Sequence, residues 1–197
     1  MFNRMYMNEA LILIDFINEI VSENGKIAQK GYSDFIRKRD TMKNVSELIV
    51  WARKKGIQIV HVKLGFFPNY SDISKVSPLF KESEKADLLK IGTWSTEIRD
   101  DIDVRSEDRM VVKTRVSAFF KTRLDYMLRE MGVDTVIIAG VATDLAVSSA
   151  VRDAHDLDFN VIVVSDCCAA ASDQDHESEL EILKKIAAVK SLKELIG

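Results

Sequence analysis

Two charged residues stand at the ends of otherwise apolar runs, an arrangement that can carry acid–base chemistry. Asp15 closes the run of residues 10–14, and Lys113 closes residues 110–112. Burial disfavours an ionised carboxyl group unless a cation lies close, and a carboxylate beside an ammonium group in a partly dry cleft can move protons at neutral pH. Such residues also serve as structural ion pairs or caps at strand ends, so their spacing alone leaves both interpretations open.

The elements that must position these residues alternate along the chain. Buried strands are predicted by short β-branched runs at residues 10–15, 57–62, 110–113, 135–139, 160–164 and 187–189. Helices are predicted between them at residues 42–55, 119–131, 143–157 and 175–185. Parallel neighbours need crossovers that hold a helix, so we expect an α/β fold with a three-layer α/β/α open, mostly parallel sheet. Its strands end at one edge, where Asp15, Lys113 and the turn at residues 140–143 should meet.

Composition limits the class of protein. The 197 residues are 47% hydrophobic and contain no linker or repeat, so a single domain over residues 1–197 is expected. The net charge of −3 is small and spread along the chain, which argues against nucleic acid as a partner. The apolar runs are too short for a membrane span and the N-terminus has no signal-like stretch, which predicts a cytoplasmic protein. The adjacent Cys167 and Cys168 fit a reducing compartment.

Residues 65–108 interrupt the alternation and are rich in aromatic side chains. Long excursions in compact domains usually form lids or binding loops. Their aromatic residues, which include Phe66, Phe80 and Trp94, would then form an apolar wall over the strand ends. Packing of the same residues onto the core, or into a subunit interface, is an equally good interpretation.

Four segments, in order, resemble the isochorismatase-like (cysteine hydrolase) superfamily. The first is the apolar strand that ends in Asp15 and is followed by Asn18, although Ile17 stands where the family usually has Gln. The others read GTWSTEI at residues 92–98, VKTRVSAF at residues 112–119, and AGVATDLAV at residues 139–147 with RDA at residues 152–154.

The resemblance implies roles for individual residues. In the family's amidohydrolases an Asp takes the proton of a thiol, a Lys stabilises both groups, and a Cys at the start of a helix attacks a carbonyl. These roles map onto Asp15, Lys113 and position 146, which is Ala146 here and cannot act as a nucleophile. The resemblance also implies a cis peptide bond between Val141 and Ala142. We expect substrate contacts from Val141, Ala142, Thr143, Phe119, Trp94 and Phe66.

Other residues near this turn offer no replacement nucleophile. Ser148 points away from Ala146 on a helix, and Ser149 lies almost a turn deeper. Thr143 is expected to cap the helix through its hydroxyl. The histidines His61, His155 and His176 lack a metal-ligand spacing, and the Asp-x-His pattern of the nicotinamidase branch is absent, so no metal or other cofactor is predicted.

Three functions are compatible with Ala146. The first is a hydrolase that acts on a small organic substrate by non-covalent acid–base hydrolysis with Asp15 and Lys113, as the superfamily's isochorismatases do on a vinyl ether without a cysteine. The second is a C–N amidohydrolase of the family in which the Cys is mutated to Ala. The third is a catalytically silent binding or scaffold protein. Because family members are commonly oligomeric, a homodimer or homotetramer is expected.

Overall fold

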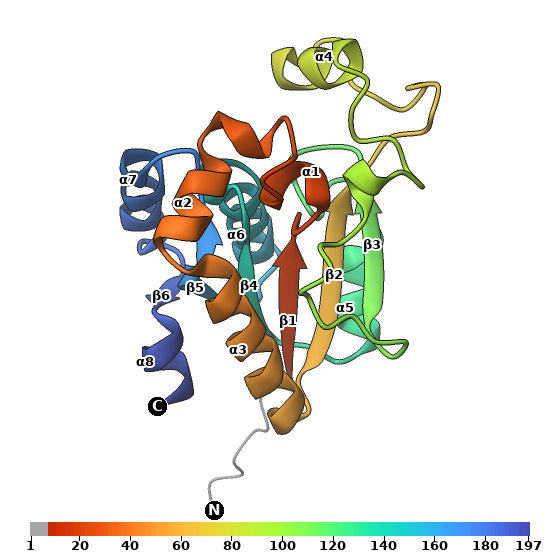
Figure 1. The fold of residues 1–197 in the computed structure, drawn as a ribbon. Coiled ribbons are helices and arrows are strands. Elements are labelled where there is room, and N and C mark those ends of the chain that lie inside the picture. The colour runs from red at the N-terminus through yellow and green to blue at the C-terminus, as the bar shows by residue number, and fades with distance from the viewer. Residues whose placement is uncertain (1–7) are drawn as a thin grey trace, which may run out of the picture.

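A parallel sheet forms the centre of the computed structural model, which describes residues 8–197; residues 1–7 of the predicted domain lie outside the described residues. All paired strands are parallel, in the order β3-β2-β1-β4-β5-β6 (Figure 1). The strands are β1 (Glu9–Ile14), β2 (Gln58–Leu64), β3 (Arg109–Lys113), β4 (Thr135–Val141), β5 (Asn160–Ala169) and β6 (Ala188–Lys190). This arrangement confirms the predicted fold class.

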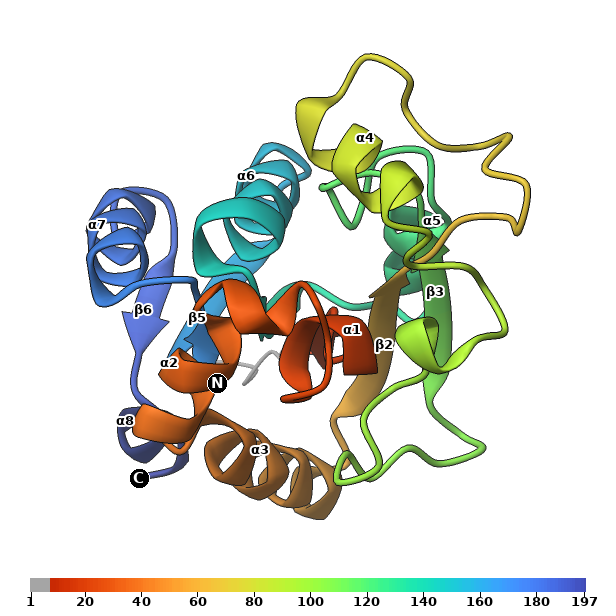
Figure 2. The same ribbon diagram turned by 45° about the horizontal axis from the view of Figure 1, so that its top comes forward.

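Helices cover both faces of the sheet. α3 and α8 pack together on one face, whereas α5 and α6 lie on the other (Figure 2). The helices are α1 (Asn18–Val21), α2 (Tyr32–Lys38), α3 (Thr41–Lys55), α4 (Pro78–Lys85), α5 (Leu124–Glu130), α6 (Ser148–Asp156), α7 (Asp173–Leu183) and α8 (Leu192–Ile196). None of the helices within residues 8–197 is long and apolar enough to cross a membrane.

The two central strands, β1 and β4, approach each other closely where they end. β4 is buried at every position, as expected for a strand covered on both faces. At Gly140 a Cβ atom would lie 2.7 Å from the backbone oxygen of Ile14, so a side chain there would force the strands apart. The absence of a side chain therefore brings the residue after β1 next to the turn after β4.

Two predicted helices begin differently in the structure. The helix expected at residues 119–131 starts only at Leu124, because the hydroxyl of Ser117 accepts from the N–H groups of Phe119 and Phe120, and Lys121 is left-handed with φ 54°. The segment expected as one helix at residues 143–157 opens with a π-helical turn, Thr143–Val147, before α6. Both changes lie next to the strand ends.

Candidate active site

Asp15 follows β1 directly and turns its side chain toward β2. Its backbone is left-handed, with φ 59°, a conformation that Asp tolerates better than most residues. Its N–H group donates to the carbonyl of Val62 at 2.8 Å, and its Oδ1 accepts from the N–H group of Leu64 at 2.7 Å. These two bonds hold the buried carboxyl group in one orientation.

Lys113 is the last residue of β3 and reaches across the end of β2 to Asp15. Its Nζ lies 2.7 Å from Oδ2 of Asp15 and donates to the carbonyl of Val116, also at 2.7 Å. The side chains of Asp15 and Lys113 are 3% and 1% exposed. The two residues that the sequence placed at separate strand ends therefore form one buried ion pair.

The carboxyl group of Asp15 has a raised pKa. Burial disfavours its charged form and is the largest influence, while the charge and hydrogen bond of Lys113 and the N–H group of Leu64 act in the opposite direction. Burial prevails because only these two donors compensate for the lost water. A carboxyl group of this kind can hold and release a proton closer to neutral pH than an exposed one.

The ion pair lies in the wall of a cavity with a volume of about 70 Å³. The ends of the strands contribute Asp15, Leu64 and Lys113, and the turn after β4 contributes Val141, Ala142 and Ala146. Since Ala146 lines the same cavity, a nucleophile at position 146 would share this space with the ion pair. The structure also contains the expected cis peptide bond between Val141 and Ala142.

The opposite walls come from α4, which lies in the aromatic excursion, and from the region around α2, which the sequence did not assign to the site. α4 supplies Leu79, Phe80 and Ser83, and the region around α2 supplies Ile27 and Tyr32. The expectation that residues 65–108 provide an apolar wall is confirmed for α4, which stands above the strand ends in Figure 1. No motif could have singled out these residues, because apolar side chains on short helices read the same whether they face a core or a cavity.

Four of the predicted substrate contacts do not line this cavity, and their placement corrects the expectation. Phe66 is fully buried and packs edge-on against Phe80 with ring centroids 5.4 Å apart, so it supports the wall from behind. Phe119 packs against Phe159. Trp94 is 45% exposed in a short 3-10 turn. The sequence showed that these residues were aromatic, but not which way they face.

Thr143 is the fourth predicted substrate contact that does not line the cavity, and its side chain faces α7 instead. Its Oγ1 is 2.8 Å from Nδ1 of His176 on α7, and both residues are buried. The prediction that its hydroxyl caps the helix is wrong, since no side chain caps the π-helical turn or α6. Burial, reinforced by the charge of Arg39, lowers the pKa of His176 to about 4, so the ring is neutral at neutral pH.

The native thiols are unsuited to nucleophilic chemistry. Cys167 and Cys168 are both buried and free. Burial raises the pKa of Cys167, and it raises that of Cys168 to about 12, so both stay protonated. Within residues 8–197, no three His, Cys, Asp or Glu side chains converge to hold a metal ion.

Comparison with known proteins decides the family. The family model described as the Isochorismatase domain matches residues 9–194. The chain belongs to the isochorismatase family.

Three relatives show the range of this similarity. The ureidoacrylate amidohydrolase RutB of Acinetobacter baylyi is 29% identical over 174 residues, which cover 82% of this chain and 71% of the relative. A protein of Arabidopsis thaliana named "probable inactive nicotinamidase" is 32% identical over 183 residues, covering 92% and 90%. The crystal structure of an isochorismatase family protein from Desulfovibrio vulgaris has a TM-score of 0.86 at 28% identity and covers 96% of both chains.

Proposed function

We propose that this isochorismatase-family hydrolase acts on a small organic substrate by non-covalent acid–base hydrolysis, with Asp15 transferring the proton. The observation that supports it is the buried pair of Asp15 and Lys113, 2.7 Å apart, in the wall of a cavity that position 146 also lines. A buried acid with a raised pKa, held by a single cation, is suited to proton transfer.

In the proposed reaction the nucleophile is water. Ala146 offers no side-chain nucleophile, and its methyl group leaves space beside the ion pair where a water molecule fits. The water oxygen bonds to the electrophilic carbon of the substrate as the bond to the leaving group breaks. Asp15 passes a proton to the leaving group and takes one from the water, which returns the carboxyl group to its starting state. Lys113 keeps the carboxyl group oriented and offsets its charge when it ionises.

Replacement of the acid tests this mechanism. General acid–base catalysis is worth about 10²–10⁴-fold in rate, so Asp15→Asn should lower turnover by about that factor. Turnover is measured with a panel of vinyl ethers, amides and ureides, and circular dichroism monitors the fold. Asp34→Asn, on an exposed face of α2, is the matched control and should retain full activity. Unchanged turnover in Asp15→Asn would contradict the assignment.

A catalytically silent binding protein is the second candidate. It is favoured by Ala146 and by the 32% identity to the relative named "probable inactive nicotinamidase". If wild-type protein turns over no member of the panel yet binds small molecules in the cavity, this second function is the correct one.

A further inference from the structure

The charge of the cavity restricts what can enter it. Building on the proposed function and its site, we propose that the cavity selects small, uncharged molecules with an apolar group and a polar end, and excludes carboxylates. The polar end lies at Asp15 and Lys113, and the apolar group lies between α4 and the segment around α2.

The first argument is that the only cation lining the cavity among residues 8–197 is already neutralised. Nζ of Lys113 contacts a carboxylate oxygen of Asp15 and the carbonyl of Val116, both at 2.7 Å. A carboxylate entering the cavity would lose its hydration and find Lys113 already engaged by Asp15 and Val116. An amide or an ether loses much less on leaving water.

Two carboxyl groups also act on the Tyr32 side of the cavity. Burial, followed by the charges of Asp144 and Asp175, raises the pKa of the Tyr32 hydroxyl. These two carboxyl groups therefore contribute negative charge near Tyr32. A second anion approaching past Tyr32 would be repelled.

The walls supply apolar contacts and two hydroxyl groups. Ile20, Ile27, Leu79 and Phe80 line the cavity. Ser83 and Tyr32 also line the cavity, and Ser83 is buried whereas Tyr32 is half-buried. Their hydroxyl groups can donate a hydrogen bond to, or accept one from, a neutral polar group of the substrate.

The volume sets the size of the molecule. A water molecule needs about 10–15 Å³ of this kind of space, so about 70 Å³ holds on the order of five waters. A compound of comparable size, such as isobutyramide, fits this limit. Isobutyrate has nearly the same shape but carries a full negative charge, so the two compounds isolate the effect of charge.

Binding of this matched pair tests the proposal. Isobutyramide and isobutyrate are titrated near neutral pH and followed by ligand-observed NMR. The amide should bind at least about tenfold more tightly, a factor that corresponds to about 1.4 kcal/mol. Ser83→Ala should weaken amide binding by about fivefold, as expected for one lost hydrogen bond.

Two variants that alter the charge of the cavity, Leu79→Arg and Asp15→Asn, should change the preference for isobutyramide over isobutyrate. Leu79→Arg places a cation in the cavity wall and should narrow or reverse the preference, whereas Val76→Arg adds the same charge to the same excursion at a residue that does not line the cavity. Val76→Arg should therefore keep the wild-type ratio. Asp15→Asn leaves Lys113 without its counter-ion and should favour isobutyrate.

Equal or tighter binding of isobutyrate by the wild-type protein would overturn the proposal, as would failure to bind isobutyramide or equal ratios in Leu79→Arg and Val76→Arg. Since binding is measured without turnover, its outcome is independent of the catalytic test. A protein that binds the amide selectively but hydrolyses nothing would refute the proposed function and leave the charge selection intact.

Discussion

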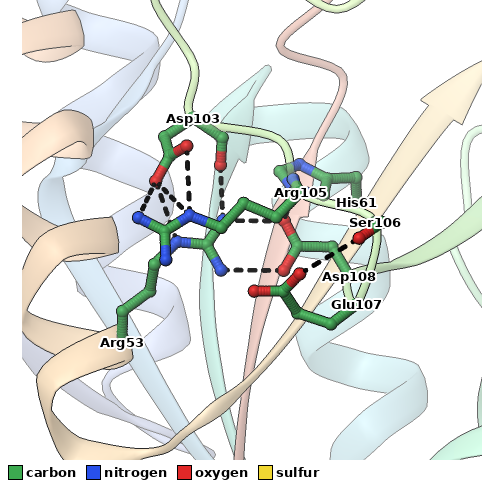
Figure 3. A network of polar contacts seen from close by, with 7 residues as sticks. All are labelled: Arg53, His61, Asp103, Arg105, Ser106, Glu107 and Asp108. Carbon is green, nitrogen blue, oxygen red and sulfur yellow. Dashed lines mark hydrogen bonds and ion pairs between the residues drawn. The ribbon is translucent and has the colours of Figure 1, made fainter.

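Two buried carboxyl groups in this protein, those of Asp15 and Asp108, have pKa values shifted in opposite directions. Asp15 has two donors, and burial raises its pKa. Asp108, whose side chain is 3% exposed, accepts from both terminal nitrogens of Arg53 at 2.9 and 2.8 Å, from His61 at 3.1 Å and from the N–H group of Arg105 at 2.9 Å (Figure 3). Burial acts on Asp108 in the same direction, but these donors prevail and lower its pKa to about 2. The depth of burial and the number of charged and N–H donors together therefore set the direction in which each carboxyl pKa moves.

The surroundings of the two groups differ as well. The residues around Asp108 join the end of α3 to the loop before β3, and none of them lines the cavity of Asp15. Arg53 also bonds to Asp103, which completes the network. We interpret the Asp108 network as a structural ion-pair network that stabilises the fold, and the pair of Asp15 and Lys113 as the one that takes part in the proposed reaction.

The largest effect on stability is expected at Asp108. Asp108→Asn leaves Arg53 without its buried counter-ion and should lower the free energy of unfolding by about 3–5 kcal/mol. Urea unfolding followed by circular dichroism measures the loss. Activity of the folded protein should persist, in contrast to Asp15→Asn.

Asp103 provides the control within the same network. Its side chain is 46% exposed, so its ion pair with Arg53 is screened by water and Asp103→Asn should cost less than about 1 kcal/mol. If Asp103→Asn and Asp108→Asn lower the free energy of unfolding equally, burial does not explain the contribution of these carboxylates to stability.

The pH dependence of stability should differ in sign between the two sites. Asp108 contributes stability that is fully present above the ordinary carboxyl pKa of 3.8 and is lost as the pH falls through about 2. The shift corresponds to about 2 kcal/mol. Asp15 does the reverse, because its raised pKa makes stability decrease as the pH rises from 3.8 through that pKa.

Urea unfolding of wild type and Asp108→Asn at pH of about 2.5 and about 5 measures this contribution. The variant should lose less stability than wild type between the two conditions. If both lose the same amount, the four donors do not hold Asp108 as a permanent anion.

A thiol introduced into the cavity should change reactivity but not stability. Ala146→Cys places the thiol in the cavity that Lys113 also lines, and a lowered pKa should make it react with iodoacetamide up to about tenfold faster than free cysteine near neutral pH. The wild-type protein is the control, since Cys167 and Cys168 are buried and have raised pKa values. Amidase activity in the variant would favour the amidohydrolase alternative, and an inert thiol would mean that position 146 is misassigned.

Local patterns were sufficient to predict much of the fold and part of the site. Alternating apolar runs and helical periods predicted the parallel sheet, and polar residues at strand ends predicted the meeting of Asp15 and Lys113. These features can be predicted because a buried strand in a parallel sheet has a run of consecutive apolar residues, and its crossover connection contains a helical period. The family motifs added Ala146 and the cis peptide bond between Val141 and Ala142.

The tertiary structure decided which way side chains face and how much water they lose. Phe66 and Phe80 are both aromatic residues of one excursion, yet only Phe80 lines the cavity. Asp15 and Asp108 are both aspartates near strand ends, yet their pKa values move in opposite directions. The direction of a side chain, its burial and its number of hydrogen-bond donors depend on segments that lie far apart in the chain. Examples are α4 over the strand ends and α3 beside the loop before β3. A local sequence pattern cannot predict contacts between such segments.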